Sequence, residues 1–141
     1  MDIILFMLSW VAGFITLLIG DMIWLGYVMQ KSIREDFKEY VAFNKDGSIQ
    51  IRLGIGLLAW AIISFGVVYF VTFQETSLLN TLLVGGLFGF ILYACYDLTN
   101  YTFFKNYSVR FLIIDIIWGA IICSLVAGAS FSVKTYLGGI L

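Results

Sequence analysis

Four long apolar segments, separated by more polar connections, dominate the pattern of the chain. We place these segments at residues 3–29, 53–73, 78–104 and 111–133. Each meets the requirement of about 20 residues for a helix that crosses the hydrocarbon core of a bilayer. Backbone groups within lipid must be hydrogen-bonded inside the segment, so helices are expected. The pattern predicts an all-α integral membrane protein, a four-transmembrane-helix bundle that forms a single domain over residues 1–141.

The first polar connection, residues 30–52, contains a shorter helical pattern. Apolar side chains recur at helical spacing among charged ones, at Ile33, Phe37, Tyr40 and Val41. This spacing favours an amphipathic helix over about residues 31–43, lying on the membrane surface. The sequence NKDG, Asn44 to Gly47, predicts the turn that ends it. An ordinary solvated loop is the alternative.

Composition supports the membrane assignment and narrows the chemistry. Hydrophobic residues make up 62% of the chain and charged residues 12%, which is typical of an integral membrane protein. The chain lacks histidine, which weakens proposals of haem, zinc or imidazole chemistry. We expect no cofactor, no bound metal and no nucleic-acid partner. The two cysteines, Cys95 and Cys123, are interpreted as packing residues. The first apolar run follows only Asp2, without a basic region, and is interpreted as a retained transmembrane helix.

Basic side chains gather at two of the three connections. They are Lys31, Arg34, Lys38, Lys45 and Arg52 around the first connection, and Lys105 and Arg110 around the third. The other side carries only Lys134. The positive-inside rule then places residues 30–52 and 105–110 in the cytoplasm and both termini on the outer side of the membrane.

An internal similarity links the first and third segments. A shift of 76 residues superposes Asp21 on Asp97 and aligns Ser32 and Arg34 with Ser108 and Arg110. The similarity favours a tandem two-helix repeat, with parallel copies related by an axis along the membrane normal. Chance similarity between two apolar helices is the alternative.

Three carboxyl groups lie inside the apolar segments: Asp21, Asp97 and Asp115. A rise of about 1.5 Å per residue puts the first two roughly 12 Å, and the third roughly 8 Å, from the cytoplasmic ends of their helices. An acid in the centre of the bilayer costs at least ~2.5–3.5 kcal/mol, so all three are expected to face the interior of the bundle. There they would share protons, bind a cation, or pair with basic groups at the cytoplasmic rim, namely Arg52, Lys105 or Arg110.

The neighbours of the three acids suggest a binding pocket. Residues three or four positions apart share a helix face, and those nearest the acids are Trp24, Trp118, Asn100 and Tyr93. Aromatic walls with a few convergent polar groups are typical of a small-ligand site, and aromatic rings beside negative charge suit an organic cation. The structural alternatives are acids that hold helices together by hydrogen bonds, and a Trp24 that anchors its helix at the interface.

Two stripes of small residues predict close helix packing. Gly85 and Gly89 form a G-x-x-x-G pair, and Ala120, Ser124 and Gly128 form a stripe on the last segment. These stripes suit packing within the chain or a homodimer.

The run YACYDLTNYTFFKNYSVRFLIIDIIWG, Tyr93 to Gly119, together with GDMIWLGY, Gly20 to Tyr27, resembles the motifs of a bacterial membrane-protein family named domain of unknown function 2177. The resemblance covers essentially the whole chain. It implies a compact four-helix protein of the bacterial inner membrane and no known activity. The motif positions that it marks are Asp21, Trp24, Tyr96, Asp97, Asn100, Asp115, Trp118 and Gly119.

Three functions fit this sequence. The first is binding or transport of a cation or small organic ligand at Asp21, Asp97 and Asp115, with proton exchange on these acids. The second is a membrane enzyme in which one acid protonates a lipid or isoprenoid and another stabilises the cation or acts as base. The third is a small regulatory subunit that meets a partner through its amphipathic helix.

Overall fold

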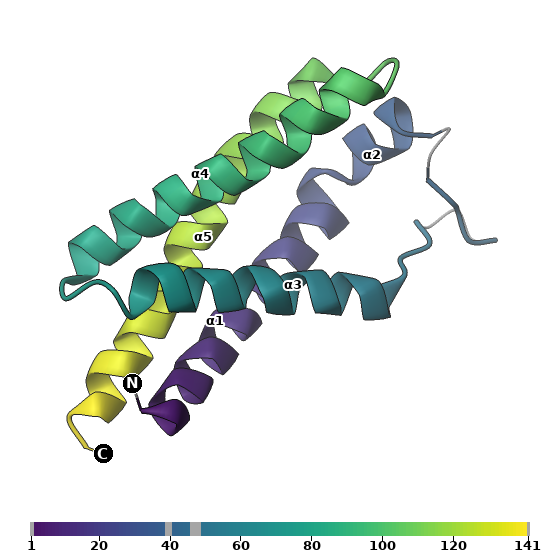
Figure 1. The fold of residues 1–141 in the computed structure, drawn as a ribbon. Helices are drawn as coiled ribbons and strands as arrows, with labels where there is room; N and C mark the ends of the chain where they lie inside the picture. The colour runs from purple at the N-terminus through teal and green to yellow at the C-terminus, as the bar shows by residue number, and fades with distance from the viewer. Residues whose placement is uncertain (1, 39–40, 46–48, 141) are drawn as a thin grey trace.

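The computed structural model describes residues 2–38, 41–45 and 49–140, and within them four long helices form a membrane bundle (Figure 1). The spans that are long and apolar enough to cross a membrane are Ile3–Val28, Leu53–Thr72, Leu78–Phe103 and Val109–Gly138. They consist of α1 (Ile3–Ile23) with the π-helical η1 (Trp24–Val28), α3 (Leu53–Val67) with the π-helical η2 (Val68–Thr72), α4 (Leu78–Phe103) and α5 (Val109–Gly138). The predicted all-α membrane bundle is confirmed.

The last helix is the centre of the bundle. α5 packs against α4, α1, α3 and η2, and its buried side chains include Ile122, Cys123 and Val126. Figure 1 shows α1, α4 and α5 running along the long direction of the molecule, with α3 lying across them. A wedge between α3 and the other helices is thereby created, and side chains from all four spans point into it.

The small residues permit the close contact of α4 with α5. A methyl group on Gly89 would collide with the backbone carbonyl of Gly119, and one on Gly85 would lie 2.6 Å from Cβ of Ala127. Ser124 of the α5 stripe donates its hydroxyl to the carbonyl of Leu82, at 2.9 Å. Both stripes therefore serve packing within the chain, while the homodimer stays a prediction.

The fourth span is longer than the predicted 111–133. The hydroxyl of Ser108 caps its start by accepting the N–H of Phe111, at 3.3 Å. At the other end Lys134 does not stop the helix, because its ammonium group donates to the carbonyls of Thr72 and Glu75 at 2.8 and 2.9 Å. The same group lies 5.2 Å from the ring centre of Phe73, so the charge is solvated by protein atoms.

The surface helix is shorter than the predicted 31–43. The described helix, α2, covers Gln30–Asp36, and Phe37 already has a non-helical backbone. Further on, an isolated bridge pairs Phe43 with Ile49. The prediction for Tyr40, and that for the second half of the NKDG turn, lie outside the described residues. Helices this short are marginal in water, and the described helix has seven residues.

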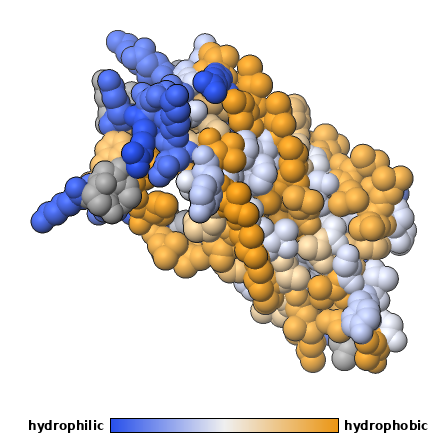
Figure 2. Space-filling model, turned by 180° about the vertical axis from the view of Figure 1, so that it is seen from behind, coloured by the Kyte–Doolittle hydropathy of each residue, from blue (hydrophilic) through white to orange (hydrophobic). Residues whose placement is uncertain are grey.

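Most of the basic side chains of the molecule gather at one end. Figure 2 shows hydrophilic side chains around the end of the molecule where α2 lies, and a mainly hydrophobic surface over the rest of the visible face. Arg52, Lys105 and Arg110 are all exposed. We call this end the basic end. α1 and α4 both run toward it, and α5 starts there.

Candidate functional site

The two D-x-x-W sequences of the chain face each other across the contact of α1 with α5. Trp118 donates its indole N–H to Oδ1 of Asp21, at 2.8 Å. In return, Trp24 donates its indole N–H to Oδ1 of Asp115, at 3.3 Å. The two indole rings stack with their centres 4.4 Å apart and 4° between their planes. We call these four residues the crossed pair.

The geometry of two antiparallel helices explains this exchange. α1 runs toward the basic end and α5 runs away from it, so residues i and i+3 on one helix lie level with i+3 and i on the other. Asp21 therefore lies level with Trp118, and Trp24 with Asp115. Trp24 also begins the π-helical turn η1, in which the N–H of Met29 donates to the carbonyl of Trp24 at 2.9 Å. Such turns inside α-helices are frequent at functional sites.

Asp97 has a different partner, from the turn between α4 and α5. Tyr107 donates its hydroxyl to Oδ1 of Asp97, at 2.6 Å. The turn brings the ring back over α4 because Asn106 adopts a positive φ of 61°, which asparagine tolerates better than most residues. Burial, and then the bond to Asp97, raises the pKa of Tyr107, so its phenol stays protonated and acts as the donor.

Asp97 and Asp115 are neighbours that can share a proton. The two carboxyl groups interact electrostatically across the contact of α4 with α5. Asp97 is fully buried, and its Oδ2 receives no donor from the described residues. Two ionised carboxylates cannot bond to each other, whereas one proton between them supplies the missing donor. One proton held jointly by Asp97 and Asp115 would satisfy the unpaired oxygen of Asp97.

A cavity of about 450 Å³ lies beside the crossed pair, and all four spans contribute to its wall. Its acidic groups are Asp21 and Asp115. Its aromatic side chains are Trp24, Trp60, Tyr93, Tyr96, Phe111 and Trp118. None of the described residues that line it is lysine or arginine. We call it the acidic cavity.

The structure brings most of the predicted site residues together. Asp21, Asp115, Trp24, Trp118, Tyr93 and Tyr96 line the acidic cavity. Asp97 and Asn100 are not among the residues that line this cavity, although Asp97 interacts electrostatically with Asp115. Trp24 contacts both Asp115 and Trp118 within the bundle, while its alternative role as an interfacial anchor stays a prediction. No three of the described acidic, cysteine or histidine side chains form a group that could hold one metal ion.

Tyr107, Trp60 and Phe111 belong to the site, although no sequence pattern pointed to them. Tyr107 lies in a connection, and only the turn geometry shows that it reaches Asp97. Trp60 and Phe111 are not near the three acids in the sequence, yet both line the acidic cavity. In contrast, the basic residues at the rim, Arg52 and Arg110, are exposed and do not line the cavity.

Comparison with known proteins agrees with the resemblance of the two motifs. The family model described as "Predicted membrane protein (DUF2177)" matches residues 6–132, which include every residue of the crossed pair and Asp97. No curated protein and no solved structure matches the chain.

Proposed function

The chain belongs to the DUF2177 family of predicted membrane proteins, and we propose that it binds an organic cation in the acidic cavity. The observation that carries this proposal is the make-up of the cavity wall, which combines two carboxyl groups with six aromatic side chains and has no basic residue among the described ones. A cavity of about 450 Å³ is within the usual size range of small-molecule sites.

The charge of the cavity favours a cation over an anion or a neutral molecule. Asp21 and Asp115 both present carboxyl oxygens, and their donors are neutral indoles that do not cancel a negative charge. Ring faces attract cations by about 0.5–2 kcal/mol each, and more when water is excluded. An organic cation also suits the mainly apolar wall, because its carbon surface is weakly hydrated and gains from burial.

Proton exchange accompanies binding in this proposal. The proton shared by Asp97 and Asp115 keeps one negative charge out of the bilayer when the cavity is empty. A cation that binds beside Asp115 stabilises the ionised form of both carboxyl groups. The shared proton is then released to the solvent. After the proton is released, the protonated Tyr107 still donates its hydroxyl to Asp97 and stabilises the ionised carboxylate.

Calorimetric titration of the purified protein with tetramethylammonium tests this function. Binding is expected for the native chain, and at least a 10-fold loss of affinity for Asp115→Asn. Asparagine keeps an oxygen to accept the N–H of Trp24 but has no charge. Glu35→Gln is the matched control, since it removes one negative charge from exposed α2 and should leave affinity unchanged. Equal affinities for Asp115→Asn and the native chain would refute the proposal.

We further propose that the basic end faces the cytoplasm of a bacterial cell and both termini face outward, because the positive-inside rule favours this orientation. With Cys95 and Cys123 replaced by alanine, a single cysteine at Asn44 should react with an impermeant maleimide only after the cells are opened. A cysteine at Thr135 should react in intact cells. The reverse labelling pattern would overturn the orientation and leave the cation site untouched.

A further inference from the structure

We infer that the cation carries an apolar tail, and that a second cavity at the basic end binds this tail. The inference rests on the proposed function, because it takes the acidic cavity as the site of the charged group. It narrows the ligand from any organic cation to an amphiphilic one, with a compact cationic group and a hydrocarbon or aromatic extension.

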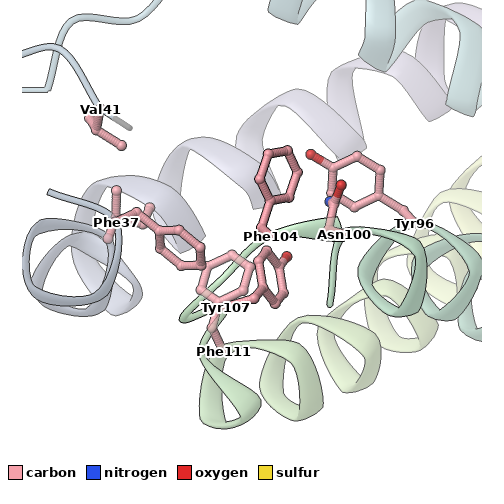
Figure 3. Close-up of a pocket in the computed structure, with 8 residues that line it drawn as sticks. Phe37, Val41, Tyr96, Asn100, Phe104, Tyr107 and Phe111 are labelled. Carbon is pink, nitrogen blue, oxygen red and sulfur yellow. The ribbon is translucent and has the colours of Figure 1, made fainter. Parts of the chain in front are cut away.

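The second cavity has a volume of about 370 Å³ and a lining of a different character. Its wall holds no charged residue among the described ones, and consists of Ile33, Phe37, Val41, Tyr96, Asn100, Phe104, Tyr107 and Phe111. These side chains come from α2 and the connection after it, from the end of α4, and from the turn that leads into α5 together with the first turn of α5 (Figure 3). We call it the apolar cavity.

Three polar side chains, Tyr96, Asn100 and Tyr107, interrupt the otherwise apolar lining of this cavity. The hydroxyl of Tyr107 is already occupied, because it donates to Asp97. The rings around them pack edge to face: the centre of Phe37 lies 5.2 Å from that of Tyr107 and 4.8 Å from that of Phe111. The remaining surface offers hydrocarbon contact and little else, so its natural occupant is an apolar group.

The two cavities are neighbours that share part of their walls. Tyr96 and Phe111 line both of them, one from α4 and the other from α5. Phe111 lies one helical turn before Asp115, and Tyr96 precedes Asp97. A molecule whose charged group lies beside Asp115 can therefore extend past these two rings toward Phe37 and Val41. The acidic end and the apolar end of this route fit one amphiphilic ligand.

A series of alkyltrimethylammonium ions, from methyl to hexyl, tests the inference by titration calorimetry. The charged group is constant, so the methyl compound measures the acidic cavity alone. Each added methylene that enters the apolar cavity should raise affinity by about 3- to 4-fold, the factor that corresponds to about 0.8 kcal/mol per buried methylene. If at least three of the five added methylenes enter the apolar cavity, hexyltrimethylammonium should bind at least roughly 30-fold more tightly than tetramethylammonium.

Val41→Trp fills the apolar cavity and distinguishes a tail site from general partition into detergent. It should abolish the gain with chain length while leaving tetramethylammonium binding intact. Ala42→Trp is the matched control, because this adjacent residue is exposed and does not line the cavity. Affinity that is independent of chain length in the native chain, or an undiminished gain in Val41→Trp, would overturn the inference while the cation site stands. If the native chain did not bind tetramethylammonium, the proposed function would be overturned, and the inference with it.

Discussion

Trp24 and Trp118 stack face to face at a centre-to-centre distance of 4.4 Å, and each donates its N–H to the aspartate that belongs to the other's helix. The stack therefore holds two carboxyl groups at the wall of one cavity without neutralising either. This arrangement connects helix packing to function, because the contact that joins α1 to α5 also positions the charges of the site.

Removing one indole N–H should weaken both stability and binding. In Trp118→Phe the ring still stacks, but buried Asp21 loses its 2.8 Å donor. We expect the free energy of unfolding to fall by about 1–3 kcal/mol, and tetramethylammonium to bind less tightly. Thermal unfolding in detergent and calorimetry measure the two effects.

Trp10→Phe is the control for that substitution. Trp10 also donates its N–H, to the carbonyl of Ala61 at 3.1 Å, but it does not line the acidic cavity. It should lower stability and leave affinity unchanged. An equal loss of affinity in both variants would show that binding follows general stability rather than the crossed pair.

Tyr107→Phe should destabilise the protein through Asp97. The substitution removes the hydroxyl that donates to Oδ1 of Asp97 at 2.6 Å and leaves a buried carboxyl with one donor fewer. We expect a loss of about 1–3 kcal/mol in the free energy of unfolding, measured by thermal or denaturant unfolding in detergent. Tyr101→Phe removes a hydroxyl from an exposed ring of α4 and should have no effect. If the two variants were equally stable, the bond to Asp97 would not contribute to the fold.

The affinity for an organic cation should rise with pH. Binding releases the proton shared by Asp97 and Asp115, so the bound state holds fewer protons than the free state, and affinity increases by at most about 10-fold per pH unit. The groups that face this pair are Asp21 on α1, Tyr93 on α4 and Tyr107 in the turn. Burial raises the pKa of Tyr107, which keeps the phenol neutral through pH 5–9.

Calorimetric titrations with tetramethylammonium from pH 5 to pH 9 measure this dependence, and the proton released is counted by repeating them in buffers of different ionisation enthalpy. Asp97→Asn removes the shared proton and should flatten the profile. A native profile that is already flat would contradict proton exchange.

A methyl group on Gly89 should disrupt the bundle. It would collide with the carbonyl of Gly119, where α4 and α5 are in closest contact, and neither backbone can retreat without moving its helix. Gly89→Ala should therefore lower the thermal midpoint and weaken cation binding, because Asp97 and Asp115 move apart. In Gly86→Ala the added methyl has only ordinary contacts, at 3.5 Å and beyond, and the helical preference of alanine should compensate for them. Gly89→Ala as stable as Gly86→Ala would disprove this account of the packing.

Much of the fold could be predicted from the sequence because hydropathy and helical rise are local properties. They placed the spans and put the three acids at similar depth. The crossed pair could not be predicted, since the shared face of Asp21 and Trp24 does not reveal which helix lies opposite. The internal similarity paired Asp21 with Asp97, whereas the reciprocal contacts in the structure join Asp21 and Trp24 to Asp115 and Trp118.

The contacts made by the segments that connect the helices could not be predicted from the sequence either. The bond of Tyr107 to Asp97 depends on the left-handed backbone of Asn106, which reverses the chain within a few residues. Lys134 was expected to lie beyond the membrane helix, because a charge ordinarily ends an apolar run. It is instead held by carbonyl groups at the end of the second span, a contact that only the packing of α5 against η2 reveals.

The central claim is that a cation binds between Asp21, Asp115 and the stacked indoles. Crystals of the protein grown with tetramethylarsonium, whose arsenic atom gives an anomalous signal, test this claim most directly. We predict one strong anomalous peak in the acidic cavity, within van der Waals contact of Trp24 or Trp118, and its loss in Asp115→Asn. A peak elsewhere on the protein, or an unchanged peak in Asp115→Asn, would contradict the account.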